Sequence, residues 1–283
     1  NVRLMNRTTI YGLFDHGIFG GLEQRPDYLL DGQKKPRQIL WKIYSKKSLL
    51  CAGATERGIS FGNNDRPGIF LSSALRSYVN TWAVSPGDNI AIFTNNSDGW
   101  ETARALQNKG CNLVAVIDSR PEASEELDSI QVFKGAKIIT TRGYNKLQSI
   151  QLSDGTKIKV DCLGVSGGWN PNLHLTCHQK GRPKWNKETA CFLPNSIPLN
   201  MKVTGSANGI FSLDQVLKDS IKKTRVICKE LGFSVGKRKT IIATSKALSI
   251  EPLWHVNGSK GRCWIDLQND VTIKDIEQSH QEG

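Results

Sequence analysis

The sequence lacks long apolar runs and paired cysteine motifs, and each absence narrows the class of protein. No stretch approaches 18 consecutive apolar residues and no signal-like segment stands at the start, so we expect a soluble protein without membrane contacts. The seven cysteines stand singly, without a C-x-x-C pair. Buried free thiols in a reducing cytoplasm are the simplest explanation of that spacing.

The sequence also lacks a recognisable DNA- or RNA-binding motif, although its charge would suit one. The formal net charge is +12, but the Lys and Arg residues are spread along the whole chain. We therefore expect no nucleic-acid partner and interpret the charge as a docking surface for acidic partner chains. The length of 283 residues is enough for roughly two domains.

Residues 87–122 predict a strand, a tight turn, a helix and a second strand. The apolar run 90–93 is too short for a helix. Asp98 and Glu101 are spaced like a capping pair at a helix start, and Gly110 stands where a left-handed residue would end that helix. The pattern is typical of a βαβ unit of the dinucleotide-binding type.

The turn of this unit lacks most of the glycine that a phosphate site needs. An intact turn would carry glycine at Thr94, Asn96 and Gly99, and only the last is present. Acidic residues at the helix start would moreover offset the helix dipole. The second strand, 113–117, ends at Asp118, where a ribose-binding acid would stand. Because the phosphate cradle is missing, we favour a structural role for Asp118.

Further strands are predicted on both sides of this unit. Residues 2–24 indicate a hairpin around Asp15-His16-Gly17, and the segments 39–44 and 48–51 have strand character. The segment 48–51 runs into Ala52-Gly53-Ala54, whose small side chains would let the backbone approach a ligand or another strand. Later strands are expected at 136–141, 147–152 and 156–160, with a hairpin turn at Asp154-Gly155, and at 163–169.

Six blocks of sequence resemble the α chain of heterotetrameric sarcosine oxidase. They are AGATERGISFGNNDRPGIFLSSALRSYVNTWAVSPG at 52–87, IAIFTNNSDGWETA at 90–103, VIDSRPE at 116–122, DCLGVSGGWNPNLHL at 161–175, GSANGIFSLDQVLKDS at 205–220 and WIDLQNDVTIKDIEQSHQEG at 264–283. The resemblance implies an α/β fold, the two-dinucleotide-binding-domain flavoprotein fold, in which one Rossmann-like domain is inserted in another in three layers and a small α+β domain follows. The expected domains are a truncated first domain at 1–68 plus 161–223, an inserted Rossmann-like domain at 69–160, and a small truncated C-terminal domain at 224–283.

The resemblance also implies where a cofactor would lie. Gly205 and Ser206 match a glycine-acid motif that closes over cofactor ribitol and diphosphate, but Ser206 replaces the acid. A carboxylate would hold flavin hydroxyls, so its absence favours NAD over FAD, although a plain strand-to-helix turn would look similar. Gly167 and Gly168 either face the cofactor or allow strands to cross tightly. The expected cofactor-binding residues are Ala52, Gly53, Ala54, Gly167, Gly168, Gly205 and Ser206.

The activity implied by the resemblance belongs to a complex of α, β, γ and δ subunits. The β subunit would carry FAD and oxidise sarcosine to glycine, FMN would lie at the α–β interface, and oxygen would be reduced to hydrogen peroxide. A C-terminal domain absent from this sequence would transfer the one-carbon unit to tetrahydrofolate. An upstream glycine-rich turn is also expected to be missing, so we expect a cytoplasmic, NAD-binding fragment with no catalytic residues and no activity alone.

Two alternatives remain open from the sequence. One is a subunit of an opine or other secondary-amine dehydrogenase, which would release a keto acid. The other is a non-catalytic scaffold subunit that binds no nucleotide, suggested by the degraded turn at 94–99.

The sequence pattern of residues 212–232 predicts a helix. Ser212 and Gln215 form an apparent capping pair, apolar residues follow helical spacing, and Gly232 would end the helix. A second face carries a basic stripe that either receives an acidic partner chain or is solvated: Lys218, Lys222, Arg225 and Lys229.

Two sets of residues have the spacing of metal ligands without the full chemistry. His174, Cys177 and His178 have ligand-like spacing, but no fourth ligand is near. Asp266 and Gln268 stand where some relatives carry a C-x-C for an iron–sulfur cluster, and carboxylate and amide are poor ligands for it. We therefore predict neither a metal ion nor a cluster, and a last helix at 275–282.

Overall fold

The structure is a computed structural model that describes residues 2–25, 36–236, 243 and 248–283, and the chain forms two compact units. Unit 1 comprises Asn1–Ala54, Pro171–Lys187 and Cys191–Ala247, and unit 2 comprises Thr55–Asn170, Glu188–Ala190 and Leu248–Gly283. The first two passages of the chain between the units lie in β5 (Ala54–Glu56) and β14 (Trp169–Pro171). Unit 2 thus contains the expected inserted domain, 69–160, together with residues 55–68, 161–170, 188–190 and 248–283.

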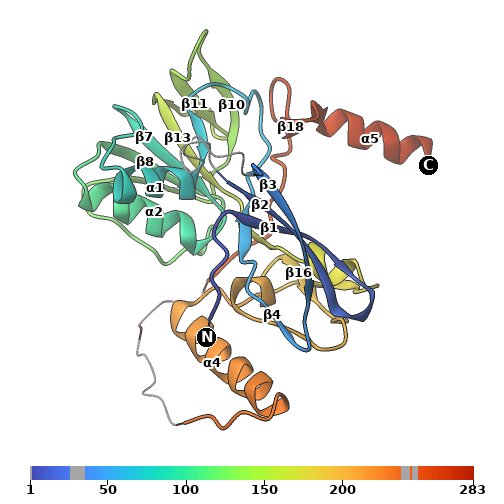
Figure 1. Cartoon of the computed structure of the whole chain (residues 1–283). Helices are drawn as coiled ribbons and strands as arrows, with labels where there is room; N and C mark the ends of the chain where they lie inside the picture. Colours follow the sequence, from blue (N-terminus) through green and yellow to red (C-terminus); the bar gives the residue numbers. More distant parts are fainter. Residues whose placement is uncertain (1, 26–35, 237–242, 244–247) are drawn as a thin grey trace. The chain divides into compact units, whose positions relative to one another are not determined.

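Unit 2 is built on a parallel five-stranded sheet in the order β6-β13-β7-β8-β9. All five residues of β7 are buried, as expected for a strand covered on both faces. Helices α1 and α2 lie side by side on one face of the sheet (Figure 1). The elements are β6 (Ile69–Leu71), α1 (Ser72–Thr81), β7 (Ile90–Thr94), α2 (Ser97–Asn108), β8 (Leu113–Asp118), β9 (Gln131–Lys134) and β13 (Cys162–Ser166).

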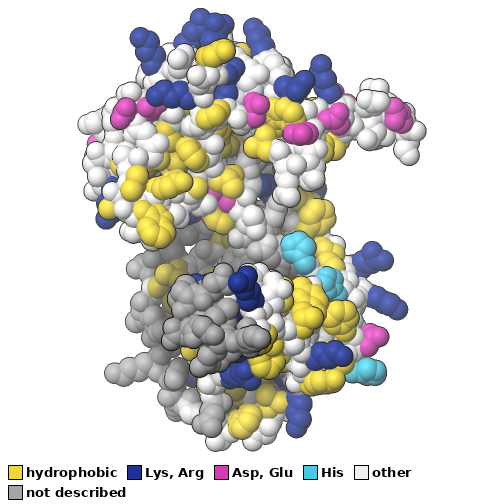
Figure 2. Space-filling model, turned by 45° about the horizontal axis from the view of Figure 1, so that its top comes forward, with side chains coloured by type: hydrophobic (Ala, Val, Ile, Leu, Met, Phe, Trp, Pro, Cys, Tyr) yellow, Lys and Arg dark blue, Asp and Glu magenta, His cyan; other side chains and the backbone are white. Residues whose placement is uncertain are grey.

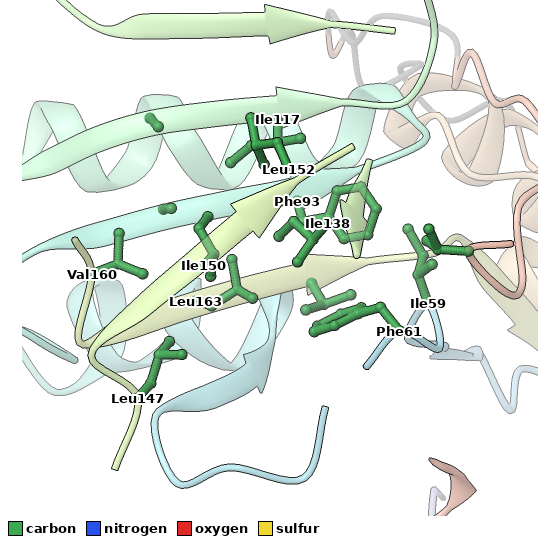
Figure 3. Close-up of a cluster of buried hydrophobic side chains, with 14 residues drawn as sticks. Ile59, Phe61, Phe93, Ile117, Ile138, Leu147, Ile150, Leu152, Val160 and Leu163 are labelled. Carbon is green, nitrogen blue, oxygen red and sulfur yellow. The ribbon is translucent and has the colours of Figure 1, made fainter. Parts of the chain in front are cut away.

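An antiparallel meander covers the other face of this sheet. It consists of β10 (Ile138–Arg142), β11 (Ser149–Leu152) and β12 (Lys157–Lys159), as the sequence predicted. Phe93, Ile117 and Leu163 of the parallel sheet meet Ile138, Ile150 and Leu152 of the meander in one buried cluster (Figure 3). The three layers of helices, sheet and meander confirm the Rossmann-like fold of the inserted domain.

Unit 1 contains the predicted hairpin, extended by a third strand. Its antiparallel sheet is β1 (Thr8–Phe14), β2 (Ile18–Gln24) and β3 (Gln38–Tyr44), with a turn η1 (Asp15–Gly17) between the first two. A second hairpin follows a short helix. Its elements are α3 (His174–Cys177), β15 (Pro183–Asn186) and β16 (Cys191–Pro194).

A parallel strand pair, β4 (Ser48–Leu50) and β17 (Met201–Val203), completes unit 1 with η3 (Gly205–Asn208) and α4 (Leu213–Glu230). The predicted helix α4 is confirmed, but its predicted cap is wrong. The Ser212 side chain makes no capping hydrogen bond and instead contacts Asp214. The chain turns left-handed at Gly232, with φ of +83°.

The C-terminal part of unit 2 is small. It contains β18 (Trp264–Asp266), β19 (Val271–Thr272) and α5 (Ile273–Glu282), close to the predicted last helix. Asp266 accepts hydrogen bonds from the Gln268 and Asn269 amides, so it closes a turn.

The surface agrees with a dispersed positive charge. Lys and Arg side chains are scattered over the visible face rather than gathered in one patch (Figure 2). Among the described helices, none combines the length and apolar character that a membrane span requires. The expected burial of the cysteines holds only in part, since Cys162, Cys191 and Cys263 are buried whereas Cys51 and Cys177 are exposed.

Candidate nucleotide-binding site

The candidate site in unit 1 begins at the parallel pair of β4 and β17. Leu50 pairs with Val203, and the Thr204 amide donates to the Leu50 carbonyl at 3.0 Å. The two segments that follow these strands, 52–54 and 205–208, therefore leave the same edge of the sheet. Ligands of open parallel sheets bind at this carboxyl edge.

The loop after β4 comes close to Ser206. A Cβ atom added at Gly53 would lie 3.9 Å from the Ser206 Oγ, and Gly53 has a φ of +73° that glycine adopts readily. Asn172 fixes the loop, because its amide donates to the Gly53 carbonyl and its Nδ2 donates to the Ala52 carbonyl, both at 3.0 Å. No sequence pattern around Asn172 indicates this role.

The loop after β17 is held by glycine conformations and by α4. Gly205 and Gly209 have φ of +69° and +74°. A Cβ atom at Gly209 would lie 2.3 Å from the Leu193 Cδ2, which is the end of a flexible side chain, so the left-handed backbone is the main reason for glycine there. Within the described part of the chain, no hydrogen bond is found from the amides of Gly53, Gly205 or Ser206.

An ion pair on α4 fastens the same loop. Asp219 accepts from the Thr204 hydroxyl at 2.7 Å and pairs with Lys223 at 3.1 Å. Lys223 also donates to the Val203 carbonyl at 2.5 Å. Spacing of four residues along a helix was the only sequence signal for this pair.

Gly167 and Gly168 belong to unit 2, whereas the other residues of the expected set belong to unit 1. The Gly167 amide donates to the Arg57 carbonyl at 2.8 Å, and the Arg57 amide donates to the Gly168 carbonyl at 2.9 Å. A Cβ atom at Gly167 would lie 2.4 Å from the Gly58 carbonyl oxygen. Tight strand crossing thus accounts for glycine at position 167.

The turn between β7 and α2 is closed by its own side chains. Asn96 caps the helix by accepting from the amides of Asp98 and Gly99 at 2.9 and 3.4 Å. The predicted capping pair of Asp98 and Glu101 is wrong. Asp98 makes a bidentate ion pair with Arg76, with both distances 3.0 Å, and Glu101 pairs with Arg104.

Asp118 is buried and fully engaged. It accepts from Trp100 Nε1 at 2.6 Å, from the Arg120 amide at 2.9 Å and from the Arg120 guanidinium at 2.7 Å. Burial alone would lower the pKa of Arg120, but hydrogen bonds and charge from Asp118 and Glu125 outweigh it and raise that pKa. An acid with these partners has no oxygen left for a ribose hydroxyl.

The residues with metal-like spacing do not form a centre. His178 Nδ1 accepts from the Leu13 amide at 3.2 Å, which explains its orientation. Among the described residues, no group of three His, Cys, Asp or Glu side chains could hold a metal ion.

Comparison with curated proteins confirms the sequence resemblance. The chain is 34% identical over its whole length to sarcosine oxidase subunit alpha of Rhizobium meliloti and 28% identical over 96% of its length to that of Corynebacterium sp. strain U-96. It spans only 29% and 31% of the length of these relatives. No protein-family profile matches the sequence.

Solved structures confirm the fold. L-proline dehydrogenase from P. horikoshii matches 98% of this chain and 52% of its own with a TM-score of 0.66 and 20% identity. An FAD-dependent pyridine nucleotide-disulphide oxidoreductase from Desulfovibrio vulgaris matches 80% of this chain and 61% of its own with a TM-score of 0.53 and 13% identity. The chain therefore has the α/β fold of two-dinucleotide-binding-domain flavoproteins.

Proposed function

We propose that this chain, whose whole length is similar to part of sarcosine oxidase α subunits, is the nucleotide-binding part of a flavin-dependent complex that oxidises sarcosine. NAD would lie in unit 1 against Ala52, Gly53, Ala54, Gly205 and Ser206. The observation that carries the proposal is the meeting of Gly53 with Ser206 at the carboxyl edge of β4 and β17.

The residues present fit a dinucleotide held by backbone. Gly53 has no side chain to block the approach, and the amides of Gly53, Gly205 and Ser206 are without protein acceptors in the described residues. Ser206 leaves the position without the carboxylate that would hold flavin ribitol. These features favour NAD over FAD in this site.

The remaining chemistry would lie outside the described residues. FAD on a β subunit and FMN at its boundary with this chain would supply the redox chemistry, with oxygen as acceptor, and a tetrahydrofolate domain would take the one-carbon unit. The γ and δ subunits would complete the assembly. The described units offer a platform, and we assign them no catalytic residue.

Titration of the purified protein with NAD by calorimetry tests the proposal, using two variants with matched backbone geometry. Gly53→Asn keeps a left-handed residue, which asparagine tolerates, but directs a side chain towards Ser206. Gly110→Asn has the same demand, with φ of +74°, and no atom within 4 Å of its Cβ. We expect Gly53→Asn to weaken NAD binding about tenfold or more, and Gly110→Asn to change it less than about twofold. Equal affinities in both variants would contradict the site.

A scaffold that binds no nucleotide is the second candidate, favoured by the closed turn at Asn96 and the engaged Asp118. Absence of any NAD binding by the wild-type protein, with its fold intact by circular dichroism, would support the scaffold and remove the NAD proposal.

A further inference from the structure

The carboxyl edge of the inserted domain is covered by the chain itself. Residues 249–251, from the C-terminal part of unit 2, run antiparallel to the turn after β7, with Ile250 bridged to Asn96. The ends of β7, β8 and β13 meet at this edge, which is where a dinucleotide would bind in such a sheet.

Backbone hydrogen bonds hold this segment against the turn. The Ser97 amide donates to the Ser249 carbonyl at 2.9 Å, and the Glu251 amide donates to the Asn95 carbonyl at 3.0 Å. The Asn95 Nδ2 in turn donates a hydrogen bond to the Glu251 carbonyl at 2.8 Å. The Ser97 amide belongs to the first turn of α2, so an amide that would face a phosphate faces a peptide carbonyl instead.

Arg120 joins the segment to the strand-end acid. Its guanidinium pairs with Asp118 at 2.7 Å and donates to the Ser249 carbonyl at 3.0 Å. Both Asp118 and Arg120 are buried. The positions that would hold a ribose or its 2′-phosphate are therefore bonded to each other and to the segment.

An apolar contact seats the middle of the segment. A Cβ atom at Gly168 would lie 2.6 Å from the Ile250 Cδ1, so the Ile250 side chain occupies the space that glycine leaves beside β13. Asn95 and Asn96 are both buried beside this segment. The Asn96 side chain also donates to the Ser166 carbonyl at 3.1 Å and so joins the turn to the end of β13.

We infer that the inserted domain uses its former dinucleotide edge as an intramolecular peptide-binding site, whose ligand is residues 249–251 of the same chain, and that it binds neither NAD nor NADP there. Its role is to anchor the C-terminal part of unit 2. This inference does not depend on the proposed NAD site in unit 1.

Hydrogen exchange followed by mass spectrometry tests the inference with a matched pair of variants. Glu251→Pro removes the amide that donates to Asn95, whereas Glu251→Ala removes the same carboxylate and keeps the amide. We expect Glu251→Pro to raise exchange in the peptide covering 95–100 about tenfold or more and Glu251→Ala to leave it near wild type. Equal exchange in the two variants would contradict the binding of residues 249–251 to the turn after β7.

The same measurement on the wild-type protein with saturating NAD or NADP locates any nucleotide. Protection confined to 48–56 and 203–209 supports both proposals, and no protection at all supports the inference while removing the NAD site. Protection of 94–99 and 118–120 by either nucleotide would overturn the inference.

Discussion

At the scale of single residues, Asp118 combines complete burial with a charged partner that is itself 6% exposed. Asp118→Asn would leave the buried Arg120 guanidinium with the neutral Ser249 carbonyl and with Glu125, 3.4 Å away, as its charged partner among the described residues. We therefore expect a loss of about 3–5 kcal/mol in the free energy of unfolding of unit 2. Asp98→Asn is the matched control, because its pair with Arg76 is partly exposed and is worth about 1 kcal/mol or less. Urea denaturation of both variants measures the difference, and similar losses would contradict the role given to Asp118.

The same residue shows what sequence could and could not tell. Its place at the end of an apolar strand was predicted, and so was a structural role. The partners of Asp118 were not predictable, because sequence spacing does not single out Trp100 and Arg120 from the other hydrogen-bond donors of the chain.

At the scale of elements, the crossing of β13 past residues 57–58 depends on glycine. In Gly167→Ala the new Cβ would meet the Gly58 carbonyl at 2.4 Å, and backbone cannot move aside. In Gly164→Ala the new Cβ would press on the ends of the Ile92 and Leu75 side chains, at 2.7 Å, and would reach the Ser72 Cα at an ordinary contact distance of 3.5 Å. We therefore expect Gly167→Ala to cost about 3 kcal/mol of unfolding free energy or more and Gly164→Ala about 1 kcal/mol, by thermal or urea denaturation. A Gly167→Ala protein as stable as Gly164→Ala would show that the crossing is looser than described.

The start of α5 is expected to depend on pH. Hydrogen bonds from the Thr272 hydroxyl and amide, each 2.7 Å, lower the pKa of Asp275 below its ordinary value of 3.8. The cap is therefore complete above pH 3.8 and is lost as pH falls through the lower folded pKa.

Asp275→Asn imitates the acidic state at neutral pH, and Asp270→Asn is the control. We expect faster exchange of the Thr272 amide in Asp275→Asn at pH 6, by NMR, and wild-type exchange in Asp270→Asn. Fraying of α5 to the same extent in both variants would argue against the capping box.

The long apolar strands β7 and β8 were predicted, and so were the left-handed glycines Gly110 and Gly232 at the ends of α2 and α4. Short strands such as β6 and β9 and the N-terminal caps of α2 and α4 were not. Apolar runs such as 90–93 and 113–117 admit few alternatives once their length excludes a helix. The spacing of a capping pair, by contrast, does not ensure a cap, because side chains elsewhere in the fold can bind the same residues. Arg76 takes Asp98, and Asn96 supplies the cap from one position before the helix.

At the scale of the whole molecule, the sequence pointed to the loops of the candidate site in unit 1. It did not show that residues 249–251 cover the carboxyl edge of the inserted domain. Loops 52–54 and 205–206 follow strands, so their meeting could be expected from the order of elements. Nothing in Ser249-Ile250-Glu251 marks a strand, because three residues carry no period and the bridge at Ile250 is isolated. For the same reason, residues 248–283 could not be assigned to the inserted domain from sequence.

We propose that NAD binds the protein in unit 1 and not at the carboxyl edge of the inserted domain. A crystal or cryo-electron microscopy structure of the protein saturated with NAD tests it most directly. We expect one nucleotide per chain, with its diphosphate against the backbone of Gly53 and Gly205. Density for a dinucleotide against Asn96 and Asp118, with residues 249–251 displaced, would contradict it.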